Sequence, residues 1–213
     1  MKDIHGTYIT LLSLHGKSFI SSEGTKQNFL ETASVSEVIH LSTHALPDPN
    51  DPQQAFITFF PGDIESRLFT HEIYNLDLSK SALVFLSACE TNFGSLSKSE
   101  GILSISRAFV FAGCPNIIST LWKAEDKSTA YITHRFYSHV ENGLSFAEAL
   151  KEAKKDLLED EKMAQFHHPV FWAHLVLVGS IPAKTYFDYF EEKMSYDKIR
   201  FGLAFLERKN QKV

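Results

Sequence analysis

Short apolar runs, separated by polar segments rich in turn-forming residues, make up the pattern of hydrophobic and polar positions along this chain. A run such as LVFL, at residues 83–86, is typical of a strand buried on both faces of a sheet. On this basis, strands are predicted at residues 8–14, 38–42, 55–60, 83–86 and 116–120, the third of them paired in a hairpin with residues 67–69.

Helical signals alternate with these runs. The segment 102–112 repeats apolar residues at helical spacing and is followed by Gly113, a suitable C-cap. Residues 45–54 contain three prolines and predict a loop, and residues 169–178 fit either a strand or a helix. The other predicted helices are residues 25–32 with Thr25 as N-cap, a short one capped by Thr70, residues 127–140, and residues 145–160 with a capping-box motif.

Alternation of strands with helices at this spacing predicts an α/β layered fold with a largely parallel sheet. The chain has 213 residues, of which 44% are hydrophobic, so it is large enough for one domain with its own core.

Charge and cysteine content exclude several classes of function. A net charge of -5 indicates no nucleic-acid partner, because nucleic-acid binding requires a clustered basic surface. Two cysteines form neither a disulfide framework nor a zinc cluster, which predicts reduced thiols in a cytoplasmic protein without a metal or organic cofactor. No apolar run reaches membrane-spanning length, so no membrane partner is expected.

Two of the predicted strands are followed by reactive side chains. The run VIHLS leads to His44, and the run LVFL leads through SA to Cys89. In open α/β sheets, chemistry gathers at the carboxyl ends of the strands. A histidine beside a cysteine generates the thiolate nucleophile, and backbone N–H groups, here those of Ala45 and Cys89, stabilise an oxyanion.

A structural interpretation of these residues competes with the catalytic one. Free cysteine is among the most buried residue types and usually packs as a small hydrophobe. This interpretation is favoured for Cys114, which lies between a predicted helix and a buried strand.

Several motifs in one order resemble the CHAT domain, a caspase-like family often joined to TPR repeats and related to the separases. They span about residues 10–182 and include IHLSTHA, LVFLSACETNFG, SEGILSISRAFVFAGCPNIISTLW and HHPVFWAHLVLVGS. The resemblance implies a caspase-like three-layer α/β sandwich, with a mostly parallel sheet between helices. It also implies hydrolysis of peptide bonds by a His/Cys dyad.

Carried over by motif, the histidine of the family falls on His44 and the nucleophile on Cys89. The acid of the LWxxxD block falls on Asp126, where a carboxylate would bind a Lys or Arg before the cleaved bond. Asp126 equally suits the N-cap of the next helix, and Glu125 competes for both roles. Glu90 is a second candidate for contact with substrate.

The sequence departs from the family pattern in two respects. Ala45 replaces the usual glycine after the histidine, and it supplies the same N–H only where its φ is negative. The chain also begins late, so an N-terminal portion of the domain is expected to be missing. The expected organisation is an incomplete CHAT domain over residues 1–185, followed by a helical extension over residues 186–213.

Three functions are therefore compared. The first is a cysteine endopeptidase that acts on a protein or peptide substrate and is activated by a partner or sensor module, for which a TPR region is the candidate. The second is an inactive caspase-like scaffold that binds peptides. The third is an α/β hydrolase or transferase acting on small acyl or thioester substrates.

Overall fold

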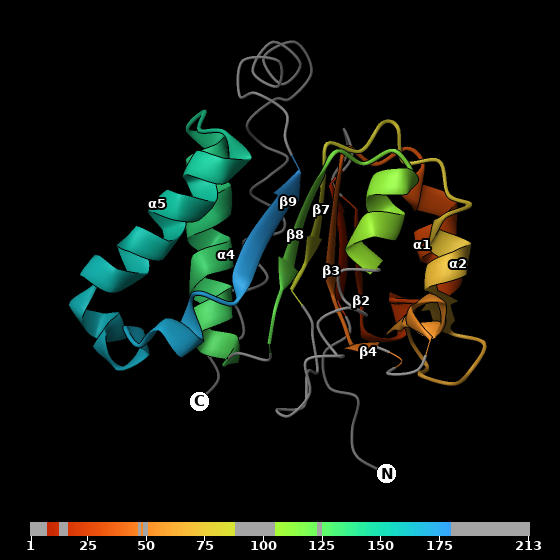
Figure 1. The fold of residues 1–213 in the computed structure, drawn as a ribbon, viewed down its shortest axis with the longest axis horizontal. Helices are drawn as coiled ribbons and strands as arrows, with labels where there is room; N and C mark the ends of the chain where they lie inside the picture. The colour runs from red at the N-terminus through yellow and green to blue at the C-terminus, as the bar shows by residue number, and fades with distance from the viewer. Residues whose placement is uncertain are drawn as a thin grey trace.

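The fold is built around one six-stranded sheet with the strand order β2-β1-β3-β7-β8-β9 (Figure 1). The computed structural model describes residues 8–12, 17–46, 48, 51–87, 105–122 and 125–179. The strands of this sheet are β1 (Tyr8–Leu12), β2 (Lys17–Ile20), β3 (Val38–Ser42), β7 (Leu83–Leu86), β8 (Asn116–Thr120) and β9 (Leu175–Gly179).

The centre of the sheet is parallel and its edges are antiparallel. Strand β7 pairs in parallel with β3 on one side and with β8 on the other. Strand β1 is antiparallel to both β3 and β2, so β2 runs in the direction of β3, β7 and β8. Strand β9 closes the other edge antiparallel to β8.

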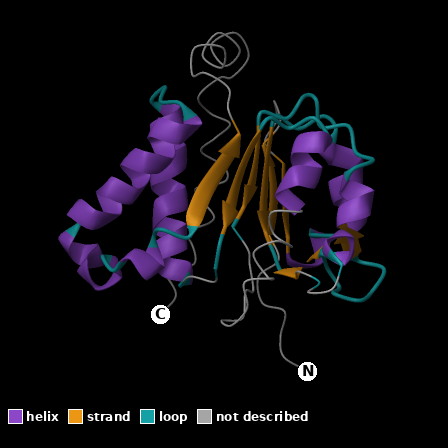
Figure 2. Cartoon of the chain, viewed as in Figure 1, coloured by secondary structure: helices purple, strands orange, loops and turns teal. Residues whose placement is uncertain are grey.

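Helices cover both faces of this sheet (Figure 2). One face carries α1 (Lys26–Ala33), α2 (Thr70–Ile73) and a helix at residues 105–111, which pack on Ile39, Leu41, Val84 and Leu86. The other face carries α4 (Asp126–Glu141) and α5 (Phe146–Glu159), which pack on Val38, Leu83, Phe85 and Ile118. The alternation of side chains along the strands thus divides the core into two layers and produces a caspase-like α/β sandwich, as predicted.

A small second sheet lies after β3. Its strands β4 (Ala45–Leu46), β5 (Phe56–Thr58) and β6 (Arg67–Phe69) are antiparallel, which confirms the predicted hairpin. Strand β4 corrects the prediction of loop throughout residues 45–54. Pairing with β5 satisfies backbone hydrogen-bonding groups of residues 45 and 46. The three prolines of the segment come after these two residues, so they do not prevent the pairing.

Most local signals act as predicted. Thr25 caps α1 by accepting a hydrogen bond from the Asn28 N–H, and Ser145 and Glu148 form the capping box of α5. Gly113 adopts a positive φ of 109° after the helix at residues 105–111.

Three segments differ from their predictions or resolve an alternative. Thr70 is the first residue of α2, and the cap comes from Glu72, whose carboxylate accepts a hydrogen bond from the Phe69 N–H at 2.9 Å. Strand β2 was not predicted, because its sequence KSFI has little apolar pattern and it forms an edge of the sheet. Segment 169–178 divides into a 3-10 turn, Pro169–Phe171, and strand β9.

The remaining described elements are short 3-10 turns. They are Ser21–Glu23, Pro52–Gln54 and Glu161–Phe166.

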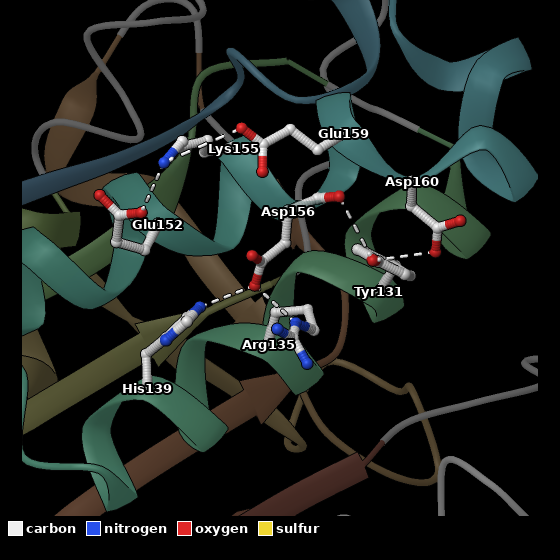
Figure 3. A network of polar contacts seen from close by, with 8 residues as sticks. All are labelled: Tyr131, Arg135, His139, Glu152, Lys155, Asp156, Glu159 and Asp160. Carbon is white, nitrogen blue, oxygen red and sulfur yellow. Dashed lines mark hydrogen bonds and ion pairs between the residues drawn. The ribbon is translucent and has the colours of Figure 1, made fainter.

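A polar network joins α4 to α5 on their shared side (Figure 3). Asp156 accepts hydrogen bonds from Arg135 Nε at 2.5 Å and from His139 Nε2 at 2.7 Å, and Tyr131 donates to Asp160 at 3.1 Å. Burial alone would raise the pKa of Asp156, but the hydrogen bonds from Arg135 and His139 outweigh it and lower this pKa. The two helices are therefore joined by a charged pair as well as by apolar packing.

We expect Asp156→Ala to lower the free energy of unfolding by about 1–3 kcal/mol, because it leaves the Arg135 and His139 donors without their acceptor. The matched control is Glu152→Ala, one turn earlier on α5, whose carboxylate pairs with the exposed Lys151 and Lys155. Its expected cost is below about 1 kcal/mol. Urea unfolding measures both, and equal losses would show that Asp156 does not join the helices.

Candidate functional site

The carboxyl ends of β3 and β7 meet at the same edge of the sheet. Their parallel pairing runs from Val38 with Leu83 to Leu41 with Leu86. It continues one residue further, since the Ser87 N–H donates to the Leu41 carbonyl at 3.0 Å. Both chains therefore leave the sheet side by side in the direction of the predicted chemistry.

His44 follows β3 directly, and the small sheet holds its backbone. The Thr58 N–H donates to the His44 carbonyl at 2.8 Å, and the Thr43 hydroxyl donates to the Thr58 carbonyl. The His44 side chain is half-buried. The β5 strand thus positions this histidine at the sheet edge with part of its imidazole open to solvent.

The backbone N–H of Ala45 is directed away from β5. The hydrogen bond from Thr58 to His44 makes Ala45 and Ile57 a pair that exchanges no hydrogen bonds, so the N–H of Ala45 faces the other side of β4. Among the described residues other than glycine, Ser21 alone has a positive φ, so Ala45 meets the condition on which its N–H could replace that of glycine.

Cys89 and Glu90 lie outside the described residues, as does the proposed extension at residues 186–213. The last described residue of the β7 segment is Ser87, two positions before Cys89.

Cys114, the other cysteine, packs as a small hydrophobe. It is fully buried and its thiol donates to the Asn116 carbonyl at 3.4 Å. Burial raises the pKa of the Cys114 thiol to about 12, so it carries no thiolate at neutral pH. The structural interpretation of this cysteine is confirmed.

Glu125, rather than Asp126, caps α4. Its carboxylate accepts hydrogen bonds from the Lys127 N–H at 2.9 Å and the Ser128 N–H at 3.2 Å. Asp126 is the first residue of the helix and is exposed. The capping role is therefore filled, and the Asp126 carboxylate remains accessible near the carboxyl end of β8.

A second histidine, which sequence reasoning did not select, lies between the strand ends and α4. His40 Nε2 is 3.0 Å from the Ser87 hydroxyl, and His40 Nδ1 is 3.1 Å from the hydroxyl of Tyr137 on α4. The imidazole stacks on Phe85, with ring centroids 4.7 Å apart. Burial lowers the pKa of His40 to about 4 and raises that of Tyr137, so both groups are neutral at pH 7. The sequence signal that could have identified His40 is the presence of a polar ring inside the apolar run VIHLS.

A third histidine, His174, lies immediately before β9. It is fully buried, its Nε2 is 3.2 Å from the Thr129 hydroxyl, and its Nδ1 has no hydrogen-bond partner in the described part of the chain. Burial, and secondarily the charge of Lys154, lower the pKa of His174 from 6.5 to about 4.

His174 makes stability depend on pH. Between pH 6.5 and pH 4 the unfolded chain binds a proton at this residue that the folded chain does not, so stability is complete above pH 6.5 and decreases as the pH falls. At pH 5 this residue is expected to lower the free energy of unfolding by about 2 kcal/mol relative to pH 8.

Urea unfolding of the wild type and His174→Gln between pH 5 and pH 8 measures this contribution. The difference at pH 8 gives the packing cost of the substitution, and the glutamine protein should lose less stability on acidification. Equal losses in both proteins would contradict a buried neutral His174.

The described residues contain no group of three or more His, Cys, Asp or Glu side chains placed to hold a metal ion. In the same part of the chain, no helix is both long and apolar enough to cross a membrane.

The caspase-like sandwich and the sequence together define the family. Residues 7–180 match the family model of the CHAT domain, and the chain belongs to this family, which is related to caspase-like cysteine peptidases. Tetratricopeptide repeat protein 28 of Homo sapiens is 33% identical over 116 residues, which are 54% of this chain and 4% of that protein.

Tetratricopeptide repeat protein 28 of Mus musculus is 26% identical over 195 residues, which are 76% of this chain and 8% of that protein. The chain thus spans less than a tenth of the length of these two relatives, whose names record TPR repeats.

Proposed function

We propose that this protein is a cysteine endopeptidase in which His44 and Cys89 form the catalytic dyad. The observation that carries the proposal is the register of β3 and β7. It pairs Val38 with Leu83 and Leu41 with Leu86, a separation of 45 residues, and the same 45 residues separate His44 from Cys89. Continuation of this register beyond Ser87 would bring the imidazole and the thiol to adjacent positions.

In the proposed reaction, His44 accepts the Cys89 proton and the thiolate attacks the scissile carbonyl. The N–H groups of Ala45 and Cys89 hold the oxyanion of the tetrahedral intermediate. As the C–N bond breaks, the imidazolium donates its proton to the leaving amine. Water, deprotonated by His44, then cleaves the thioester and restores the thiol. The direction of the Ala45 N–H away from β5 supports this assignment.

Asp126 is the proposed recognition residue for a basic side chain before the cleaved bond. Its carboxylate is exposed at the start of α4, whose cap is provided by Glu125, so it is available to a Lys or Arg. Glu90 is the second proposed contact with substrate.

The proposed substrate is a protein or peptide, and a TPR region is the proposed regulatory partner, in keeping with the names of the two relatives. The enzyme is proposed to act in the cytoplasm, where a reactive thiol stays reduced. Residues 1–185 are the proposed catalytic unit, and residues 186–213 are the proposed extension.

Labelling by peptide chloromethylketones tests the dyad. We would treat wild type, His44→Ala and Cys89→Ala with reagents that carry Arg, Lys, Leu or Asp before the ketone, and locate the adduct by mass spectrometry. We expect wild-type Cys89 to be labelled, fastest by the Arg and Lys reagents, and His44→Ala to be labelled far more slowly. Cys114 is the internal control, since its buried thiol should remain unlabelled.

If Cys89 in the wild type reacts no faster than in His44→Ala, whichever peptide is used, the dyad is wrong. The scaffold function would then be preferred, and a Cys89→Ala protein with full biological effect would establish it. Labelling by thioester probes without cleavage of any peptide would instead favour a hydrolase or transferase of small acyl groups.

A further inference from the structure

Three side chains link α4 to the carboxyl ends of β3 and β7. Tyr137 contacts His40 Nδ1, His40 Nε2 contacts the Ser87 hydroxyl, and the Ser87 hydroxyl reaches the Leu41 carbonyl at 3.4 Å. We refer to Tyr137, His40 and Ser87 as the buried chain, after its buried end at Tyr137; His40 and Ser87 are half-buried. It ends at Ser87, where the segment that contains Cys89 begins.

The hydrogen bonds of the buried chain have one direction that uses every proton. Tyr137 donates to His40 Nδ1, His40 donates from Nε2 to Ser87, and Ser87 donates to the Leu41 carbonyl. The reverse direction leaves the Tyr137 hydroxyl proton without an acceptor among the described residues, at a side chain that is only 7% exposed. The imidazole is therefore assigned as the neutral Nε2–H tautomer.

The buried chain has the outline of a serine, a base and an orienting group, yet it does not activate Ser87. The orienting group is a phenol rather than a carboxylate, so it does not stabilise an imidazolium as a carboxylate would. With its pKa lowered to about 4 by burial, His40 is too weak a base to take a proton from a hydroxyl at neutral pH. In the assigned direction, moreover, His40 donates to Ser87 rather than accepting from it.

We propose that His40 is a positioning residue, which holds the carboxyl end of β7 through Ser87 and so orients the segment that carries Cys89. This inference rests on the proposed dyad. Strands β3 and β7 are already joined there by the Ser87 N–H and the Leu41 carbonyl. The buried chain adds a side-chain restraint from α4, the helix that also begins with Asp126. The nucleophile segment and the proposed recognition residue are thereby tied to one helix.

The test compares variants of the buried chain with controls that remove similar contacts elsewhere. The variants are His40→Phe, His40→Gln and Ser87→Ala. The first control is Ser81→Ala, which removes a hydroxyl that donates to the Ser36 carbonyl at 2.7 Å next to the other end of β7. The second is His174→Gln, which removes a buried histidine that bonds Thr129 rather than the β7 segment.

Two reagents separate orientation from acidity of the thiol. Iodoacetamide is small and reports the thiolate fraction of Cys89, whereas an arginyl chloromethylketone reacts only when peptide and thiol are aligned. We expect His40→Phe and Ser87→Ala to lower the rate of the chloromethylketone relative to iodoacetamide by about 10- to 100-fold. The ratio of the two rates in a His40→Phe/Ser87→Ala double variant should fall no further than in either single variant, because both substitutions break the same series of hydrogen bonds.

His40→Gln should recover part of this ratio, since its side-chain amide donates to Ser87. Both controls should keep the wild-type ratio, even where their melting temperatures fall. In the wild type, the ¹⁵N chemical shifts of the His40 ring should report a neutral Nε2–H tautomer at pH 7.

The positioning inference and the dyad fail in different ways. If His44→Ala slows labelling but His40→Phe and Ser87→Ala behave like Ser81→Ala, the positioning inference is wrong and the dyad stands. If His44→Ala has no effect on Cys89, the dyad is wrong and His40 has no nucleophile to position. A charged or Nδ1–H imidazole of His40 at pH 7 would overturn the assigned direction of the hydrogen bonds between Tyr137, His40 and Ser87. The positioning role would then be wrong as well.

Discussion

Replacement of His44 by alanine is expected to lower kcat for peptide hydrolysis by about 100- to 10,000-fold. The proposed dyad uses this imidazole twice, first to form the thiolate and then to protonate the leaving amine. KM should change little, because substrate recognition is assigned to Asp126 and Glu90. The backbone of residue 44 is held by Thr58 through a main-chain bond, so the substitution should preserve the local fold.

The measurement is steady-state cleavage of fluorogenic peptides with Arg or Lys before the scissile bond, using the full chain. The matched control is His71→Ala, which removes an exposed histidine from α2 and should leave kcat unchanged. Added imidazole should restore part of the lost rate in His44→Ala and none in Cys89→Ala. A His44→Ala protein with wild-type kcat would assign the proton transfer to another group.

The largest loss of stability is expected for Phe85→Ala, about 3–5 kcal/mol. Phe85 lies in the central strand β7 and is fully buried. Its ring centroid is 4.7 Å from that of His40, 5.5 Å from that of Phe136 and 6.0 Å from that of Tyr137. Alanine leaves a cavity between the sheet and α4, because a close-packed core closes such a space only in part.

Urea unfolding followed by circular dichroism measures this loss. Phe85→Leu keeps most of the buried volume and should lose less, so it provides a result even if the alanine protein does not fold. Phe111→Ala is the control, since that ring is 74% exposed and its removal should cost about 0.5 kcal/mol or less. Equal losses at Phe85 and Phe111 would contradict the assignment of Phe85 to the core.

The same substitution links packing to the proposed site. The Phe85 ring is the stacking surface of His40, so its loss should also loosen the buried chain. Phe85→Leu is therefore expected to lower the ratio of the two labelling rates, in the same direction as His40→Phe. The Asp156→Ala protein should keep the wild-type ratio despite its lower stability, because the hydrogen bonds of Asp156 join α5 to α4 rather than to β7.

Local chemistry was readable from the sequence wherever neighbouring residues decide the structure. The apolar runs VIHLS, LVFL and NIIST predicted the three parallel central strands, and Thr25, Gly113 and the Ser145 capping box predicted helix boundaries. Strands β2 and β4 were missed because their own residues show little apolar pattern, and their backbones are stabilised by pairing with β1 and β5.

The proposed site divides in the same way. Placement of His44 and Cys89 after two buried strands, and the motifs that identify the CHAT family, depend on sequence alone. The register that separates paired residues of β3 and β7 by 45 positions, the direction of the Ala45 N–H and the meeting of His40, Ser87 and Tyr137 depend on the tertiary structure.

The physical reason is that hydrophobic periodicity specifies which residues are buried, but not which buried residues become neighbours. Tyr137 lies 97 residues after His40, and only the packing of α4 on the sheet brings their polar atoms within 3.1 Å. The sequence by itself determined the three central strands, the family and the candidate nucleophile. Tertiary packing decided which histidine is held by the small sheet at the strand end, and which one joins the end of β7 to α4 through hydrogen bonds.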